Sequence, residues 1–510
     1  MKKICNFRPI VLFAMSLILG GYFFAVSKFR DWVGFVSIGL ILAVSIFVFI
    51  MFCKTKKTKI INIAVACFLI PFLIGGVLTE FQINKKLNTV TADGSYLITG
   101  TVVQGGYDND LYNFVLDDVI LNTDKQTFDV EGEVYVRSIV RSSKAINVGD
   151  KITFYGTYNY TYKDNCSNNP LNIYSYTGMA YISEVVNVQS GQGIKYSILK
   201  WSKSQLNSSM DPNEANISYA MLFGDKMLMD SELKTNYKVA GVSHILAVSG
   251  LHIGFLIALL GLLLSKIIKN KWLYTSILFG ILLTYAYICG WTPSVMRAVV
   301  MFGVVILSKF MFAQYDPLNS LAIAAMVNII ISPLNIFNVG FLLSFSVSFS
   351  IFALGMPLKV LLQSKMPQKV ASSLSISISA WIGSLPIILF YFGTISTYAV
   401  LINFLILPAI GVVFGCLVIT LLISGLWAGV LVIPELMING LNLIVEGIAN
   451  LKSSYIIAQN NFLIMVIGFV AISLISQYNF IRHKRLYACA TSVLFIAITV
   501  VYSIIKGGYV

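Results

Sequence analysis

The chain has 510 residues, of which 57% are hydrophobic and only 11% are charged. A chain of this length would ordinarily form several soluble domains, but this balance lies far outside the composition of soluble proteins. It excludes a soluble globular protein, a collagen, a disordered chain and a coiled coil. With a mean hydropathy of +0.81 and long apolar runs toward both ends, the chain is predicted to be a polytopic membrane protein.

The formal net charge of +14 is concentrated in the hydrophobic parts of the chain. Residues 1–79 carry a net charge of +8 and residues 241–510 a net charge of +10, whereas residues 80–190 carry −5. The basic residues form short clusters between apolar runs, at Lys2 to Arg8, Lys54 to Lys59, Lys266 to Lys271, Lys359 to Lys369 and Arg482 to Arg485. Because cytoplasmic loops of membrane proteins are rich in lysine and arginine, this pattern indicates topology and not a nucleic-acid-binding surface.

Thirteen apolar runs are predicted to span the membrane, three before the acidic segment and ten after it. They cover residues 10–26, 33–53, 60–79, 244–265, 272–290, 294–312, 317–332, 336–356, 372–391, 397–424, 428–450, 460–479 and 486–505. Strict alternation places the N-terminus and every basic cluster in the cytoplasm, and it places residues 80–240 and the C-terminus outside. The first run is interpreted as a span and not as a cleaved signal peptide, because Phe23-Phe24-Ala25 is a poor small-residue cleavage site.

Between residues 95 and 190 the hydrophobic period changes from helical to alternating. This predicts five strands, at Tyr96 to Gln104, Leu111 to Val119, Glu133 to Val140, Lys151 to Tyr158 and Met179 to Val188. Five short strands without a long helix favour a small closed β-barrel of the OB type. The segment that follows, residues 195–206, has the pattern of an amphipathic helix at the membrane interface.

Tyrosines are concentrated in the second half of this predicted domain, and four of them are candidates for stacking on single-stranded bases: Tyr155, Tyr158, Tyr160 and Tyr162. The alternative is that they are ordinary strand-surface and interface residues. The net charge of −5 favours this alternative because it repels phosphate. Only one of the seven cysteines, Cys166, falls in this segment, so it has no partner for a disulfide within the domain.

Two of the three histidines lie within an eleven-residue motif, His244 to Gly254, at the outer mouth of a predicted span. Gly250 and Gly254 would let another helix approach closely, while the side chains of His244, Ser249 and His252 supply polar atoms where lipid supplies none. The motif therefore predicts a polar mouth on a tightly packed helix.

Four interpretations of this motif are considered: a metal site, a serine hydrolase, a hydrogen-bonded gate and structural packing. On an ideal helix the two histidines would be roughly 12 Å apart along the axis, which argues against a metal site unless Ser249-Gly250 breaks the helix. An intramembrane serine hydrolase built on Ser249 would lack the usual glycine before the nucleophile and a local acidic partner. A hydrogen-bonded gate and simple structural packing are the other two interpretations.

Charged and amide side chains are scarce in the membrane half, so each is a candidate for a transport pathway. Arg297 lies about one turn inside a predicted span and is expected to face protein or water. Asp316 precedes a proline and could instead cap a helix. Glu446 could instead lie on an exposed, amphipathic outer surface. Asn403 lies close to Pro408, a combination found both in broken pathway helices and in ordinary kinked spans.

Two predicted spans have serine at every second position, over residues 344–350 and 373–379. Such alternation would mean a strand in a soluble protein, but lipid does not tolerate unpaired strand edges. We therefore expect helices with hydroxyl groups on several faces, which belong inside a bundle.

In order along the chain, these motifs resemble the membrane domain of the ComEC DNA-uptake channel family. The resemblance rests on Gly224-Asp225, His244 to Gly254, Pro293-Ser294 with Arg297-Ala298, Asp316-Pro317, Val339 to Phe345, Leu385-Pro386, Phe390 to Gly393 and Asn403. It implies passage of single-stranded DNA through the inner membrane of a bacterium during natural transformation. It also implies partners, namely a surface DNA receptor that hands over the DNA and a cytoplasmic ATPase that pulls it.

The resemblance also implies a domain order. Residues 1–79 would be an N-terminal three-span segment, 80–190 an extracytoplasmic OB-like domain, 191–240 amphipathic interfacial helices, and 241–510 a competence-type transmembrane channel. The predicted pathway residues are Asp225, His244, Ser249, His252, Arg297, Asp316, Asn403 and Glu446. The competing functions are transport of another polymer or of a lipid-linked substrate, and the serine hydrolase.

The sequence departs from the family pattern in two places. Many members continue into a metallo-β-lactamase-like nuclease domain with clustered histidines, whereas the only histidine after residue 252 here is His483. We therefore expect no catalytic residue, no bound zinc and no other cofactor in this chain, and a separate nuclease is a possible partner. The second departure is Leu342, which stands where the family usually has glutamine.

Overall fold

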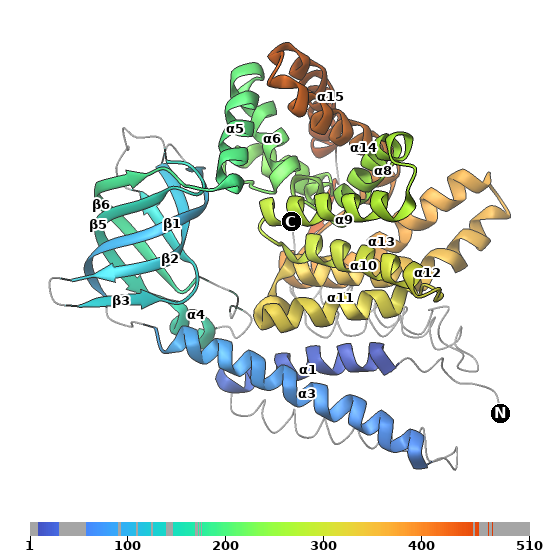
Figure 1. Ribbon diagram of the computed structural model, residues 1–510, viewed down its shortest axis with the longest axis horizontal. Coiled ribbons are helices and arrows are strands. Elements are labelled where there is room, and N and C mark those ends of the chain that lie inside the picture. Colours follow the sequence, from blue (N-terminus) through green and yellow to red (C-terminus); the bar gives the residue numbers. More distant parts are fainter. Residues whose placement is uncertain are drawn as a thin grey trace.

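The computed structural model describes residues 9–29, 58–89, 93–108, 111–123, 126–138, 146–168, 176–451 and 454–457, and the single positions 172, 174, 468 and 472. The predicted spans at 33–53, 460–479 and 486–505 fall almost entirely outside the described residues. Within the described residues, eight helices are long and apolar enough to cross a bilayer. The chain is therefore a mostly helical, multi-pass membrane protein, and a β-sheet follows its helices α1 (Pro9–Phe29) and α3 (Thr58–Leu87) (Figure 1).

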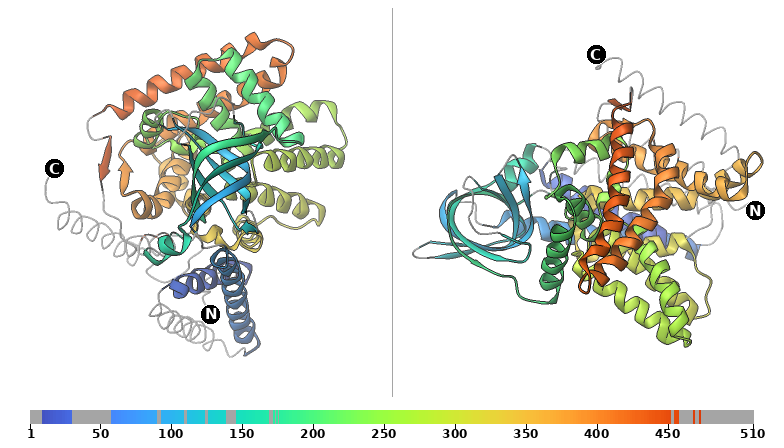
Figure 2. Two further views of the ribbon diagram at one scale, coloured as in Figure 1. Left: turned by 90° about the vertical axis from the view of Figure 1, so that its left-hand side faces the viewer. Right: turned by 90° about the horizontal axis from the view of Figure 1, so that it is seen from above.

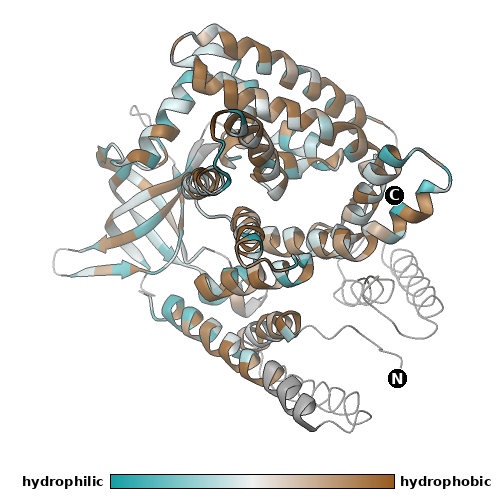
Figure 3. Cartoon of the chain, turned by 45° about the vertical axis from the view of Figure 1, so that its right-hand side comes forward, coloured by the Kyte–Doolittle hydropathy of each residue, from teal (hydrophilic) through white to brown (hydrophobic). Residues whose placement is uncertain are grey.

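The membrane helices lie together at one end of the molecule, with the sheet at the other (Figures 1 and 2). One of the eight, α1, precedes the sheet, and the other seven follow it. The helices after the sheet are α8 (Gly250–Ile267), α9 (Lys271–Ile288), α10 (Pro293–Phe310), α11 (Pro317–Ile331), α12 (Val339–Gln363), α13 (Gln368–Phe392), α14 (Ala399–Ser424) and α15 (Val432–Ala449), of which α11 is not among the eight. Helix α11 has 15 residues and is shorter than the others. These helices are rich in hydrophobic residues (Figure 3). Several of these residues are exposed, among them Leu262, Leu405 and Leu422, which are more than 60% exposed. Such surfaces suit contact with lipid.

Two helices before the sheet, α1 (Pro9–Phe29) and α3 (Thr58–Leu87), pack against each other at very short range. A Cβ atom built on Gly20 would lie 1.9 Å from the carbonyl oxygen of Phe72, and one built on Gly75 would lie 2.1 Å from that of Leu17. Only glycine fits at these two positions. Small residues allow this kind of backbone approach between helices in a membrane, where packing drives association.

The sheet contains β1 (Gly94–Asp108), β2 (Leu111–Asn122), β3 (Thr127–Val130), β4 (Val134–Ser138), β5 (Lys151–Tyr160) and β6 (Gly178–Gln189). The strand order is β1-β5-β6-β4-β2-β3, and β1 also pairs with β2, so the pairing of five strands returns to its first member. All pairs are antiparallel except β4 with β6. The five predicted strands correspond to five of these six, and the four-residue strand β3 was not predicted. Fully buried side chains fill the inner side, including Ile98, Phe114, Leu116 and Phe154.

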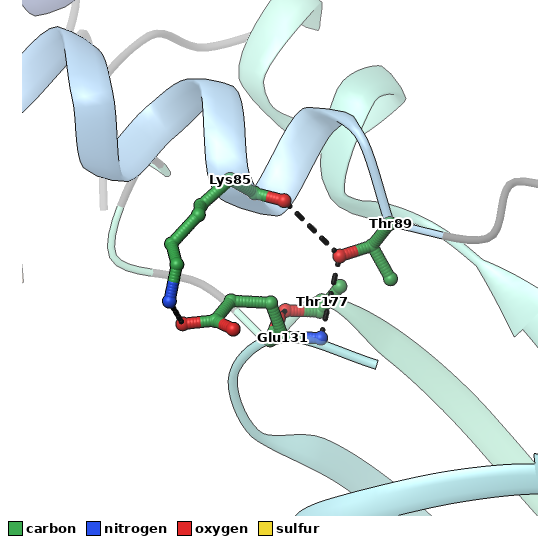
Figure 4. Close-up of polar contacts among 4 residues, drawn as sticks. All are labelled: Lys85, Thr89, Glu131 and Thr177. Carbon is green, nitrogen blue, oxygen red and sulfur yellow. Dashed lines mark hydrogen bonds and ion pairs between the residues drawn. The ribbon is translucent and has the colours of Figure 1, made fainter. Parts of the chain in front are cut away.

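The end of α3 is fixed to the sheet by a small set of polar contacts (Figure 4). Lys85 Nζ lies 2.9 Å from Glu131 Oε1, and the backbone N–H of Glu131 donates to Thr89 Oγ1 at 3.3 Å. Thr177 Oγ1 donates to the carbonyl oxygen of Glu131 at 2.7 Å. The ion pair is exposed and contributes little, because solvent screens it. The hydrogen bonds to the Glu131 backbone fix the position of the sheet relative to α3.

The short helix α4 (Tyr162–Asn168) lies between β5 and β6 and packs against α3. Tyr162 and Cys166 are both fully buried there. Lys86 Nζ lies 4.9 Å from the centre of the Tyr162 ring. Burial raises the pKa of the Cys166 thiol to about 11, although the hydrogen bond from Tyr162 and the charge of Lys86 oppose this effect.

Three helices lead from the sheet into the membrane bundle: α5 (Ile194–Ser209), α6 (Pro212–Phe223) and α7 (Ser231–Val239). Helix α5 contains the predicted interfacial segment and buries Leu199 and Leu206, while Ile194 is 80% exposed. The side chain of Asp230 caps α7 by accepting from the N–H of Glu232. The short 3₁₀ helix η2 (Ser243–Leu246) follows and ends just before α8.

The remaining short elements connect the later helices. They are the 3₁₀ helices η3 (Pro333–Phe337) and η4 (Ala428–Leu431), and the strands β7 (Thr394–Ser396) and β8 (Tyr455–Ile457), which pair with each other. The strand pair joins the α13–α14 connection to the segment after α15.

Candidate functional site

The predicted start of the fourth span at residue 244 is wrong, because α8 begins at Gly250 and His244 lies in η2. Ser249 is the residue that precedes α8, and its Oγ accepts from the N–H of Leu251 at 3.3 Å. His252 Nδ1 accepts from the N–H of Ser249 at 3.2 Å and lies 3.0 Å from Ser249 Oγ. Serine and histidine thus form a capping box, which satisfies backbone donors that a helix start leaves unpaired. The helix therefore breaks at Ser249-Gly250.

The side chain of His252 is completely buried, and its ring packs edge-on against Phe414 of α14, with 4.8 Å between ring centres. Its Nε2 atom has no hydrogen-bond partner among the described residues. His244 is exposed. Among the described residues, no group of three or more histidine, cysteine or acidic side chains could hold a metal ion.

Arg297 of α10 lies directly against the first residue of α8. A Cβ atom built on Gly250 would lie 2.3 Å from Arg297 Nη2, so this glycine makes room for the guanidinium group. Arg297 Nη1 donates to Ser348 Oγ of α12, and Arg297 Nε is buried without a partner among the described residues. The predicted small-residue face is only half correct, because nothing lies within 4 Å of a Cβ atom built on Gly254.

The guanidinium group of Arg297 has no acidic partner in the part of the chain that the structure describes. The two ion pairs found there join Lys28 to Glu80 and Lys85 to Glu131. The start of a helix carries a partial positive charge, so Arg297 and the start of α8 present two positive groups to the same space. This arrangement favours the binding of an anion between the guanidinium group and the start of α8.

The segment before η2 contacts both the sheet and the start of α8. Asp225 follows Gly224, whose φ of +86° ends α6. Its Oδ1 accepts from the N–H of Met227 at 3.0 Å, whereas its Oδ2 is buried without a hydrogen-bond partner among the described residues. Burial raises the pKa of Asp225, although the hydrogen bond from Met227, the charges of two nearby lysines and the nearby N–H of Gly105 in β1 oppose this effect. Lys226 Nζ donates to the carbonyl oxygen of Ser243, directly before His244. Asp225 thus lies where the sheet meets the membrane half.

The other predicted pathway residues lie on three different helices. Asp316 caps α11, because its Oδ1 accepts from the N–H groups of Leu318 at 3.0 Å and Asn319 at 3.4 Å. Glu446 is exposed on α15. Asn403 is on α14, and its Oδ1 is buried without a partner among the described residues. The start of α8 therefore gathers Ser249, His252 and Arg297, but not these three.

The four candidate stacking tyrosines differ in exposure. Tyr155 is 53% exposed, and Tyr160 is partly exposed and donates through its hydroxyl to the carbonyl oxygen of Lys86. Tyr158 and Tyr162 are fully buried, which corrects the expectation that they present rings to bases. Tyr158 is buried because the alternation of β5 points its side chain into the core of the sheet domain. Tyr162 is buried because α4 packs on α3 and covers it.

The serine run of α12 separates into two faces, and one of its members was missed as a site residue. Ser346 and Ser350 donate to the carbonyl oxygens of Gly383 and Ser379 in α13. Ser348 instead accepts from Arg297. Because residues four apart share a helix face, the run binds α13 on one side and meets the arginine on the other. The sequence alone does not reveal which serine lies opposite Arg297.

These features define a multi-pass membrane protein with polar side chains gathered at the start of one span. Residues 221–482 match the family model described as competence protein, and the chain belongs to this family. Over 234 residues it is 31% identical to ComE operon protein 3 of Bacillus subtilis. The matched region covers 44% of this chain and 29% of that protein. Over 133 residues it is 27% identical to Recombination protein 2 of Haemophilus influenzae. This matched region covers 24% of this chain and 17% of that protein.

An uncharacterised protein of Mycoplasma pneumoniae is 26% identical over 217 residues, which is 38% of this chain and 54% of that protein. The chain thus spans less than one third of the first two curated relatives and about half of the third. No solved structure matches the chain.

Proposed function

We propose that the protein is a channel that carries single-stranded DNA across the bacterial cytoplasmic membrane into the cytoplasm during natural transformation. Membership of the competence protein family supports this role. The structural observation that carries the proposal is Arg297, an intramembrane cation without a carboxylate partner among the described residues, placed against the start of α8.

An anionic polymer that enters a bilayer loses the hydration of its phosphates, so its path needs hydrogen-bond donors. His244, Ser249, His252 and Arg297 are proposed to form a polar constriction that supplies them. Asn403 is proposed to belong to the same path because its buried oxygen has no partner among the described residues. Asp316 and Glu446 are left out of the constriction, since Asp316 caps α11, Glu446 lies on α15, and the negative charge of both repels phosphate.

Residues 80–190 are proposed to form an OB-like barrel outside the cytoplasm, followed by interfacial helices over 191–240 and the channel domain over 241–510. The circular pairing of five strands supports the barrel. Asp225 is proposed to connect the barrel to the channel, because its carboxylate lies close to Gly105 of β1. Tyr155 is the stacking candidate that remains with an exposed ring. The partners implied by the ComEC resemblance are a surface DNA receptor, a cytoplasmic ATPase and a separate nuclease.

The direct test of this function is DNA uptake in a host with and without the gene. Fluorescently labelled DNA that becomes resistant to added nuclease has crossed the membrane. The proposal expects such DNA in the host that carries the gene and none in the deletion strain. Equal protection in both strains would leave transport of another polymer or of a lipid-linked substrate as the better reading.

The proposed topology predicts the side from which engineered cysteines react. Glu184 is exposed on the sheet and Lys365 is exposed in the α12–α13 connection. In intact cells a membrane-impermeant maleimide should label Glu184→Cys, whereas Lys365→Cys should react only after the membrane is permeabilised. The unaltered chain is the control for its native cysteines. The reverse labelling pattern would invert the topology and refute the outside location of the sheet.

The Ser249–His252 contact would also suit the nucleophile and base of a serine hydrolase. A variant of Ser249 distinguishes this function from the proposed channel gate. Ser249→Ala removes the cap, which costs about 0.5–2 kcal/mol, and we expect uptake to fall by less than tenfold. A nucleophile would lose activity by several orders of magnitude. The matched control is Ser265→Ala, because Ser265 is exposed near the other end of α8. Uptake should be compared at equal membrane abundance.

A further inference from the structure

The guanidinium group of Arg297 is only partly satisfied. Its Nη1 donates to Ser348, its Nη2 lies against Gly250, and its Nε has no partner among the described residues. A buried guanidinium has five N–H donors and normally binds carboxylate or phosphate through two of them at once. A single serine hydroxyl cannot do this. The site therefore has donors to spare for an anion.

The hydroxyl of Ser348 is oriented to accept a hydrogen bond. Its own proton goes to the carbonyl oxygen of Ser344 at 2.9 Å, which leaves its lone pairs for Arg297. Ser348 is 6% exposed, so no solvent competes for this position. One turn away on the same face, Ser344 Oγ is buried without a partner among the described residues. This face of α12 thus holds one acceptor for the arginine and one unused hydroxyl beside it.

We propose that Ser348 is the resting partner of Arg297, and that a phosphate of the incoming strand replaces it. Phosphate accepts two hydrogen bonds from a guanidinium group and carries the negative charge that a hydroxyl lacks, so it binds the guanidinium group more strongly than a single serine hydroxyl does. The exchange releases α12 from α10 and opens the constriction. The inference rests on the proposed function because it takes the phosphodiester chain as the cargo. Ser348 is a positioning residue that sets how easily the arginine accepts that cargo.

The test compares two variants of equal shape that differ only in the hydroxyl, Ser348→Thr and Ser348→Val. The full chain is purified in lipid nanodiscs, and binding of a single-stranded oligothymidine and of inorganic phosphate is measured. Without the competing hydroxyl, Ser348→Val should bind both probes about tenfold or more tightly than Ser348→Thr, which is the ratio that a hydrogen bond to a charged group represents. A merely structural role would not raise affinity.

The matched control is the neighbouring pair Ser350→Thr and Ser350→Val, because Ser350 is equally buried but donates to α13. These two variants should bind the probes equally. If neither variant at position 348 reaches the membrane, Ser348→Ala adds no volume and should show the same rise relative to the unaltered chain.

Equal binding by Ser348→Thr and Ser348→Val, or weaker binding by the valine variant, would overturn the partner exchange. The proposed function fails on a different result, which is equal uptake of nuclease-resistant DNA by hosts with and without the gene. An affinity difference at position 348 that disappears when Arg297→Leu is added shows that the serine acts through the arginine. A difference that persists without the arginine would also overturn the inference.

Discussion

Arg297→Leu should abolish DNA uptake, and Arg297→Lys should reduce it by about tenfold or more. Leucine leaves no cation at the start of α8, so a phosphate that enters there finds no charged donor. Lysine keeps the charge but cannot bind two phosphate oxygens at once, since its ammonium is a point charge while the guanidinium group is a planar fork. The site therefore needs the shape of arginine as well as its charge.

The measurement is nuclease-resistant labelled DNA per cell, at membrane abundance matched by immunoblot. Lys309→Leu is the control, because Lys309 lies exposed at the other end of α10 and its loss should leave uptake nearly unchanged. The decisive combination involves two variants. If Arg297→Leu transports normally while Ser249→Ala is inactive, the channel mechanism is wrong and the hydrolase takes its place.

Gly20→Ala and Gly75→Ala should each destabilise the α1–α3 pair strongly, and the double variant should fail to accumulate in the membrane. Each added methyl group would meet a backbone carbonyl oxygen at about 2 Å, and backbone atoms cannot turn away as the end of a side chain can. Overpacking of this kind typically costs about 1–3 kcal/mol per site. The two helices must move apart, and the close contacts along both of them weaken together.

Matched controls are available because other helical glycines have open space around them. A Cβ atom built on Gly280 of α9 or on Gly415 of α14 has no neighbour within 4 Å. Alanine there should be neutral or stabilise the protein by up to about 1 kcal/mol, which is the difference in helix propensity. Thermal unfolding of the purified chains in detergent decides the matter. An unchanged midpoint for Gly75→Ala would contradict the packing described for α1 and α3.

The membrane helices and the strands could be predicted because both depend on local patterns. Length and apolar content mark a span, and alternation marks a half-buried strand. The start of α8 could not be placed by hydrophobicity, since the apolar residues 245–248 before Ser249 extend the hydrophobic run beyond the helix. The spacing Ser249-x-x-His252 was the usable signal, because it is that of a capping box in which histidine replaces the usual glutamate or glutamine.

The site was predictable where single residues were unusual and unpredictable where it depended on contacts between helices. Arg297 stands out in the sequence as an intramembrane cation, but its partner Ser348 is 51 residues away on another helix. The burial of Tyr158 could have been expected, because it shares the inward alternation of Ile152 and Phe154 in β5. Tyr162 gave no such signal, since its burial comes from the docking of α4 on α3.

The buried position of Cys166 makes the sheet domain insensitive to the redox state of its surroundings. Thiols react as thiolates, and burial holds the pKa of Cys166 at about 11, well above neutral pH, so the side chain stays in the unreactive thiol form. Residues 80–190 contain no second cysteine, so no disulfide within the domain competes with this state. In the proposed location outside the cytoplasm, the domain is able to mature without an oxidative folding catalyst. Its stability comes from its own apolar core and stays the same whether the host's exterior is oxidising or reducing.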